Sequence, residues 1–170
     1  GGGIHCRSAE IDLCEIVDNR TGNDGGGINI SYYSRIRNCV VARNHARRDG
    51  GGIYTSYNSL IENCTVCSNS CEASGGGLYG YDETNVNVIS YYNVPDNFTN
   101  YNPYSVINYC CMYPLQSGAG NISNEPSFMD YETGDYRLLH DSPCFNAGTN
   151  ETWMAFSHDL SNQDRIIDGT

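Results

Sequence analysis

Runs of three glycines recur along the first half of the chain at a nearly constant interval. They begin at Gly1, Gly25, Gly50 and Gly75, and each run is followed by Ile or Leu. A period of 24 or 25 residues indicates a stacked-repeat protein, in which neighbouring units bury a common core. Any functional surface must then be built from equivalent positions of successive units.

Each repeat has the pattern of short strands. Segments 28–32, 53–57 and 78–81 follow the glycines and are rich in β-branched and aromatic residues. If one repeat forms one coil, equivalent residues stack at the parallel-strand spacing of about 4.8 Å. The sequence therefore predicts an all-β fold, a right-handed single-stranded parallel β-helix with about 25 residues per coil.

Apolar residues that repeat at a spacing of 25 define the expected interior. The first repeat is one residue short, and the missing residue lies before Ile11. We predict three inward columns: Ile11, Ile36, Ile61 and Val86; Cys14, Cys39, Cys64 and Ile89; Ile16, Val41, Val66 and Tyr91.

Asparagine and glycine occupy the expected turns. Asn19, Asn44 and Asn69 are in register, and asparagine tolerates a left-handed backbone and can bond to the amide of the next coil. We interpret them as a turn ladder. The glycine triplets serve tight turns and close approach between coils. A phosphate-binding loop is disfavoured, because no helical pattern follows and the chain has no Lys.

Composition predicts one small domain outside the reducing cytosol. The 170 residues include nine cysteines, 39% hydrophobic residues and only 17% charged residues. The chain has no signal peptide, initiator Met or apolar run long enough for a membrane span, so we expect a processed or excised piece of an exported protein. The net charge of -11 argues against nucleic acid as a partner.

The cysteines divide between core positions and bridges. Cys14, Cys39 and Cys64 fit a buried column, although stacked neighbours could also bridge. Cys67 and Cys71 are candidates for a local disulfide. A metal site with Cys64 is disfavoured because a second ligand pair is missing, so we expect no metal and no cofactor.

Arg43, His45, Arg47 and Arg48 form the only basic cluster. We interpret it as a solvated loop that offsets nearby carboxylates, with a polyanionic glycan as the alternative.

The repeat is lost after Pro95. We divide one structural domain into four regular coils over 1–94, an irregular last coil or loop over 95–116, and a tail over 117–170 packed on the end of the helix. The tail motifs occur in a fixed order: Cys110–Cys111, Gly-Ala-Gly-Asn-Ile at 118–122, Glu-Pro-Ser-Phe at 125–128, Gly-Asp-Tyr-Arg-Leu at 134–138, Ser-Pro-Cys-Phe-Asn-Ala-Gly-Thr-Asn at 142–150, Trp153–Met154, Asp159–Leu160 and Arg165–Ile166.

This order resembles the C-terminal end of bacterial surface proteins of the right-handed parallel β-helix class, the choice-of-anchor Q group. The coils are also similar to the Gly-Gly-Gly-Ile coils of chlamydial polymorphic membrane proteins. The resemblance implies an exported protein tethered to the cell surface and assigns no enzyme activity. It also implies a disulfide from Cys110 or Cys111 to Cys144, which would close a loop of about 35 residues and stabilise the fold by about 3–4 kcal/mol.

Both ends of the chain look cut. Tails in that group continue past the Arg-Ile segment into a further strand, whereas this chain stops at Thr170, and Gly1 starts within a coil. An uncapped coil exposes unpaired backbone groups, so missing residues or another copy of the chain should cover it. End-to-end contacts between copies that do not close a ring would build a filament.

No catalytic residues are predicted, because the outward column after the glycines lacks the carboxylate pair of polysaccharide-cleaving enzymes. That column reads His5, Asn29, Tyr54 and Tyr79. Tyr54 and Tyr79, with Tyr57 and Tyr81 beside them, form a candidate glycan-binding strip; packing between coils is the alternative. Six sequons are candidate glycosylation sites, of which Asn29, Asn97 and Asn150 should face water: Asn19, Asn29, Asn63, Asn97, Asn121 and Asn150.

The sequence therefore favours a secreted or surface-exposed structural or adhesive β-helix. A more specific version of this hypothesis is that copies of the chain stack end to end into a filament. The alternative is a carbohydrate-binding or polysaccharide-degrading β-helix protein. The expected partners are other copies of the chain and glycans.

Overall fold

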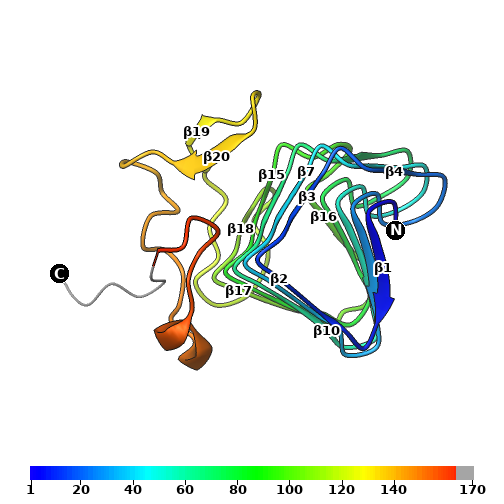
Figure 1. Ribbon diagram of the computed structural model, residues 1–170, viewed down its shortest axis with the longest axis horizontal. Coiled ribbons are helices and arrows are strands. Elements are labelled where there is room, and N and C mark those ends of the chain that lie inside the picture. The colour runs from blue at the N-terminus through cyan, green and yellow to red at the C-terminus, as the bar shows by residue number, and fades with distance from the viewer. Residues whose placement is uncertain (164–170) are drawn as a thin grey trace.

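The computed structural model describes residues 1–163 and shows a parallel β-helix with a tail along one side (Figure 1). Each coil adds one strand to each of three parallel sheets, so the cross-section is triangular. Sheet A contains β1 (Ile4–Arg7), β5 (Ile28–Ser31), β9 (Ile53–Ser56), β13 (Leu78–Gly80) and β16 (Phe98–Asn100). Sheet B contains β2 (Glu10–Asp12), β6 (Arg35–Arg37), β10 (Ser59–Glu62), β14 (Glu83–Val86) and β17 (Val106–Asn108). Sheet C contains β3 (Glu15–Val17), β7 (Val40–Ala42), β11 (Thr65–Cys67), β15 (Ile89–Tyr91) and β18 (Cys111–Met112), and a small sheet D contains β4 (Arg20–Thr21), β8 (His45–Ala46) and β12 (Ser70–Cys71). The predicted parallel β-helix is confirmed.

The glycine triplets turn the chain into sheet A. Gly25, Gly50 and Gly75 have φ angles of +70°, +67° and +70°, which favour glycine. A Cβ atom on Gly51 would lie 2.4 Å from the carbonyl oxygen of Gly76 in the next coil. The predicted roles in tight turns and in close approach between coils are both confirmed.

An asparagine ladder fixes the turn from sheet C to sheet D. The Nδ2 of Asn44 donates to the carbonyl oxygen of Ile16 at 2.8 Å and to Oδ1 of Asn69 at 3.0 Å. The backbone N–H of Asn44 donates to the same Oδ1 at 2.9 Å. Asn19 bonds to Asn44 in the same way, so the predicted column is confirmed, and it continues through Asn93 and Asn97.

The interior is narrow and apolar in the first three coils. Ile11, Ile36 and Ile61 pair in register and are buried. Cys39 and Cys64 are buried in the neighbouring column and belong to the same core. These cysteines therefore pack as small apolar residues, as the sequence predicts.

The short first repeat also behaves as predicted. Arg7 pairs with Ser31, whereas Glu10 pairs with Arg35. The missing residue therefore lies between β1 and β2, before Ile11.

The fourth coil departs from the predicted register. Ile61 pairs with Asn85, where a spacing of 25 predicts Val86. One residue is missing between Gly80 and Glu83 relative to the third coil, and a shift of one residue exchanges the two faces of a strand. The inward positions predicted for Val86, Ile89 and Tyr91 are therefore wrong, and the buried residues are Asn85, Val88 and Ser90.

This shift places two polar side chains inside the fourth coil. Asn85 is fully buried, and its Nδ2 donates to Oε1 of Glu83 at 3.4 Å. Ser105 Oγ donates to Oε2 of Glu83 at 3.0 Å. Gly80 leaves the space for the carboxyl group, because a Cβ there would lie 2.0 Å from Glu83 Oε1. Burial raises the pKa of Glu83 to about 7, against the opposing effect of the Ser105 hydrogen bond.

Residues 95–116 are more regular than predicted. Strands β16, β17 and β18 complete a fifth coil that pairs with the fourth. The coil is shorter, since Val86 pairs with Asn108, 22 residues further on. The irregular last coil expected from the sequence is therefore a paired coil of reduced length.

The tail pairs with the last coil at the edge of sheet C and then runs along the side of the helix, whereas the sequence predicts packing on the helix end. Ile122 forms a parallel bridge with Cys111 of the last coil. The hairpin of β19 (Phe128–Asp130) and β20 (Asp135–Leu138) and the 3-10 helix η1 (Thr152–Phe156) lie beside sheets B and C (Figure 1). The Arg165–Ile166 motif lies outside the described residues.

Replacing Asn44 with Ala should destabilise the fold by about 2–4 kcal/mol, because it leaves several buried backbone and amide groups of two neighbouring coils without partners. Urea unfolding should show a lower midpoint at an unchanged m-value. Asn23→Ala, at an exposed turn position, is the control and should change stability by less than about 0.5 kcal/mol. Equal stability of the two variants would contradict a structural role of the ladder.

The buried carboxyl of Glu83 should make stability fall as pH rises. Its folded pKa of about 7 lies above the ordinary value of 4.5, so folding favours the protonated form. The stabilisation is complete below pH 4.5 and is lost as pH rises through 7, by up to about 3 kcal/mol. In Glu83→Gln, the urea midpoint should no longer fall between pH 5 and pH 8. A variant that retains the wild-type slope would refute the assignment.

Candidate functional site

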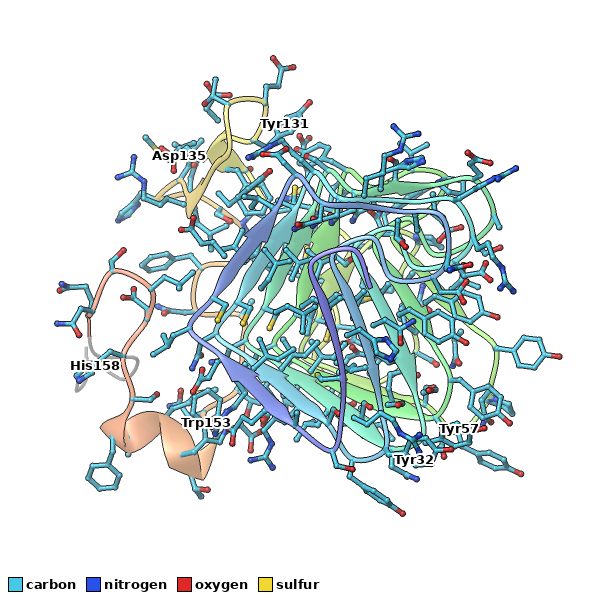
Figure 2. All side chains as sticks on the ribbon, turned by 45° about the vertical axis from the view of Figure 1, so that its right-hand side comes forward. Tyr32, Tyr57, Tyr131, Asp135, Trp153 and His158 are labelled. Atoms are coloured by element: carbon cyan, nitrogen blue, oxygen red, sulfur yellow. The ribbon has the colours of Figure 1, made fainter. Side chains whose placement is uncertain are left out.

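Tyrosine side chains form two rows on the outside of the helix. On sheet A, the rings of Tyr54 and Tyr79 are stacked, with centroids 5.3 Å apart and planes at 3°. The guanidinium of Arg7 begins the second row, 4.0 Å from the ring centroid of Tyr32. This second row lies at the corner between sheets A and B, and we call its tyrosines the tyrosine ladder: Tyr32, Tyr57, Tyr81 and Tyr101. Figure 2 labels Tyr32 and Tyr57 at this corner.

The rings of the tyrosine ladder cover one another's faces. Consecutive centroids lie 4.6, 5.9 and 5.9 Å apart, with the first and last pairs stacked and the middle pair edge to face. Tyr57 is nevertheless 48% exposed and Tyr101 is 72% exposed. The ladder therefore presents ring edges and hydroxyl groups to solvent, while the stacked faces stabilise the coils by about 0.5–1.5 kcal/mol per pair.

Two consecutive left-handed residues make this corner in each of two coils. Tyr32 and Tyr33 have φ angles of 58° and 60°, and Tyr57 and Asn58 have 59° and 55°. Such angles cost about 1–2 kcal/mol per non-glycine residue. Hydrogen bonds between coils offset that cost, as when the N–H of Tyr33 donates to the carbonyl oxygen of Tyr57 at 3.0 Å.

The sequence-predicted glycan residues divide between the two rows. Tyr54 and Tyr79 stack on sheet A, whereas Tyr57 and Tyr81 belong to the ladder. Sequence reasoning missed Tyr32, although it lies 25 residues before Tyr57, because the outward columns that it followed do not include this position. It missed Tyr101 because the shortened fifth coil places this residue only 20 positions after Tyr81. The signal that could have found them is an aromatic residue directly after the sheet A strand of each of these coils.

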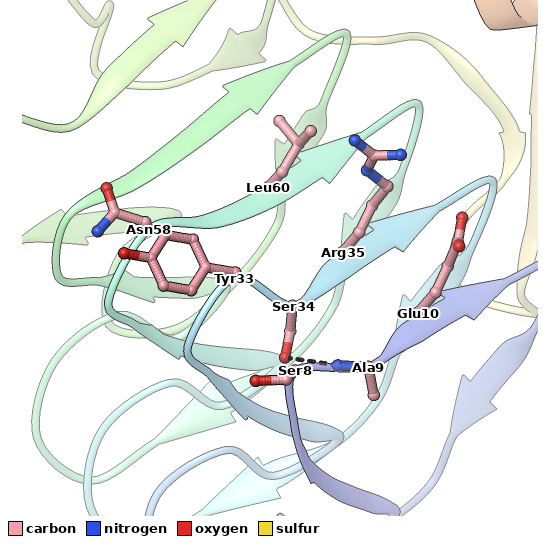
Figure 3. A pocket seen from close by; sticks show the side chains of 8 residues that line it. All are labelled: Ser8, Ala9, Glu10, Tyr33, Ser34, Arg35, Asn58 and Leu60. Carbon is pink, nitrogen blue, oxygen red and sulfur yellow. Dashed lines mark hydrogen bonds between the residues drawn. The ribbon is translucent and has the colours of Figure 1, made fainter.

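A shallow pocket of about 450 Å³ lies beside the ladder, where the corner meets sheet B (Figure 3). Tyr33 lines it and is 75% exposed. Glu10, Arg35 and Asn58 also line it, from three successive coils. The pocket therefore combines an aromatic ring, a guanidinium, a carboxylate and an amide.

Charged side chains on the outer face of sheet B hold the tail. Glu62 is 6% exposed, and its Oε1 accepts a hydrogen bond from Trp153 Nε1 of the tail at 3.2 Å. The guanidinium of Arg37 lies 4.8 Å from the Trp153 ring centroid and also pairs with Glu10. Burial raises the pKa of Glu62, against the opposing effect of the Trp153 hydrogen bond.

Glu10 and Glu62 lie 52 residues apart, which is not a multiple of the coil length of 25, so the sequence already places them out of register. Asp12, Arg37 and Glu62 occupy one column of sheet B, so Glu10 and Glu62 are not in register. Asp12 lies 3.5 Å from Arg37, and Glu62 lies 3.6 Å from Arg35. Each carboxylate thus serves an ion pair.

The structure separates the six sequons by exposure. Asn150 is exposed and Asn29 is half-buried. Asn97 is 8% exposed and donates to the carbonyl oxygen of Tyr113 at 2.9 Å, so the expectation that it faces water is wrong. The half-buried, hydrogen-bonded members are Asn19, Asn63 and Asn121. Glycosylation itself stays a prediction.

The structure has the cysteines as thiols. It brings Cys39 into hydrogen-bond contact with both Cys14 and Cys64, and it also brings together one pair that the resemblance implies. The Cys111 thiol hydrogen bonds to Cys144, which raises the pKa of Cys111 and lowers that of Cys144. Cys110 instead accepts the N–H of Val88 inside the core, at 3.4 Å. The geometry therefore favours Cys111 in the predicted bridge. Cys67 and Cys71 are buried on neighbouring strands, and their bridge stays a prediction.

No family model, curated protein or solved structure matches this chain. Among residues 1–163, no group of three or more His, Cys, Asp or Glu side chains is placed to hold a metal ion. No helix in the same part of the chain has the length and apolar character needed to cross a membrane.

Proposed function

We propose that this chain is a non-catalytic structural and adhesive β-helix of an extracellular or cell surface, and that it binds glycan chains along the tyrosine ladder. The observation that carries the proposal is the continuous row of partly exposed tyrosines, which spans four successive coils and ends at Arg7. Tyrosine is enriched at binding surfaces because one end of its side chain is apolar and the other forms hydrogen bonds.

The geometry of the ladder fits an extended ligand. Its rings repeat with the coils, and consecutive ring centroids lie 4.6 to 5.9 Å apart. Because each ring is held by its neighbours, little side-chain freedom is lost on binding, and this preorganisation increases affinity. A polysaccharide chain along the helix axis would offer repeated hydroxyl partners to such a row.

The charged residues on sheet B support the non-catalytic part of the proposal. Glu62 is committed to Trp153 and Arg35, and Glu10 is committed to Arg37. Hydrolysis of a glycosidic bond needs two carboxyl groups that face the bond, one acid and one base or nucleophile. Carboxylates held in structural ion pairs serve the attachment of the tail.

Removing the ladder hydroxyls should weaken glycan binding without unfolding the protein. The triple variant Tyr32→Phe, Tyr57→Phe and Tyr101→Phe keeps the stacked rings but loses three hydrogen-bonding groups, each worth about 0.5–1.5 kcal/mol. Isothermal titration with a neutral β-glucan and with a polyuronate should show affinities reduced about tenfold or more.

The matched control is Tyr54→Phe with Tyr79→Phe, which removes hydroxyls from the row on sheet A. Its affinities should stay within about twofold of wild type, and thermal melting should show both variants folded. Unchanged affinity in the triple variant, or an equal loss in the control, would contradict the proposed surface. If the wild type binds neither polymer, the adhesive function fails.

End-to-end stacking is a separate proposal. Within residues 1–163, strands β1 to β4 each pair with one neighbour only, and pairing with another copy would satisfy their outer edges. Electron microscopy of concentrated protein should then show rods of several subunits. Dispersed single subunits at the same concentration would rule the filament out.

A further inference from the structure

We infer that the pocket beside Tyr33 is a subsite for a sugar acid, so that the glycan bound by this surface is one that carries carboxylate groups. The inference rests on the proposed function and adds a substrate class to it. Tyr33 supplies an aromatic ring face, and Arg35 supplies a guanidinium group that can pair with a carboxylate.

Tyr33 has a ring face that can receive a sugar. No other ring stacks on Tyr33 among the described residues, whereas the ladder tyrosines cover one another. The side chain is 75% exposed and lies beside Asn58 at the edge of the pocket (Figure 3). The apolar face of a pyranose ring can pack on such a ring, and the Asn58 amide is placed to bond with sugar hydroxyls.

Arg35 has a guanidinium with unused donors. Its side chain is 46% exposed, and its ion pair with Glu62 joins Nε to Oε2 over 3.6 Å. Neither of its two NH₂ groups donates a hydrogen bond to any of residues 1–163. A guanidinium is always charged and presents donors in a planar fork that matches a carboxylate in two parallel hydrogen bonds.

The charged side chains around the pocket leave the two NH₂ groups of Arg35 available to a ligand. Glu10 also lines the pocket, but its carboxylate pairs with Arg37, which in addition lies near Asp12. Three carboxylates and two guanidinium groups therefore face one another on this part of sheet B. Anion recognition at Arg35 thus depends on hydrogen-bond geometry and not on a positive field, in a chain whose net charge is -11.

Arg7 adds a second cation at the same end of the ladder. Its guanidinium stacks on Tyr32, the residue that precedes Tyr33 at the corner, and it has no ion pair within the described part of the chain. The two guanidinium groups lie in the first two coils, whereas the ladder continues away from them to Tyr101. An acidic polysaccharide would therefore bind with acidic groups at the end of the surface nearest β1.

The test compares two polymers and two Arg variants. Titrations use a polyuronate and the same polymer after its carboxyl groups have been reduced to alcohols. Wild type should bind the polyuronate about tenfold or more tightly than the reduced polymer. Arg35→Gln should lose that preference, because charge-assisted hydrogen bonds are worth more than neutral ones, and should bind the reduced polymer as wild type does.

The control is Arg47→Gln, which removes the same charge from an exposed side chain whose only ion pair among residues 1–163 is a long one of 3.9 Å. It should retain the preference within about twofold. Tyr33→Ala should weaken the binding of both polymers, since it removes the stacking face.

Three results would overturn the inference: wild type without preference for the polyuronate, Arg35→Gln with the wild-type preference, or Arg47→Gln with the same loss as Arg35→Gln. In each of these cases binding of the reduced polymer would leave the proposed ladder function in place. Failure of wild type to bind either polymer would remove both.

Discussion

Registered stacking of one coil on the next is the constraint on which this structure depends. Parallel hydrogen bonds join each strand to its equivalent in the following coil, and the asparagine ladder repeats the same arrangement at a turn. Because Asn44 bonds to both neighbouring coils, its position is fixed only when all of them are in register. The core, the turns and the outer rows of side chains all inherit their order from this stacking.

A single missing residue shows how strongly register controls the interior. The shortened link before β14 turns Asn85 inward and brings Glu83 into the core, where an uninterrupted repeat would have placed apolar and exposed residues. The fold accommodates this change through local compensation: Gly80 provides space, and Ser105 and Asn85 provide hydrogen bonds. Tyr81, which lies within this shortened link, packs edge to face against Tyr57 at the corner.

Most of the β-helix could be predicted because glycine, asparagine and isoleucine report local requirements that recur at a fixed spacing. The turns at Gly25 and Gly50 and the column from Ile11 to Ile61 follow from that spacing directly. The register of Asn85 could not be predicted from the glycine positions, since no glycine triplet follows the fourth coil and its shortening therefore changes no interval between triplets. The contact between Trp153 and Glu62 could not be predicted either, because Trp153 lies in the tail, which does not follow the 25-residue repeat.

The same stacking that builds the outer surface also limits how that surface can bind. Rings that repeat from coil to coil cover each other's faces, so Tyr57 and Tyr81, which have a ring on either side, present edges and hydroxyl groups to solvent. A free aromatic face occurs where the column is interrupted: the residue that follows the ladder position is Tyr33 in the second coil, Asn58 in the third and Asp82 in the fourth. Tyr33 therefore has no ring above it to stack on. The departure from the repeat thus creates the feature that a sugar ring can recognise, and Arg35, two residues further on, lies in the same pocket.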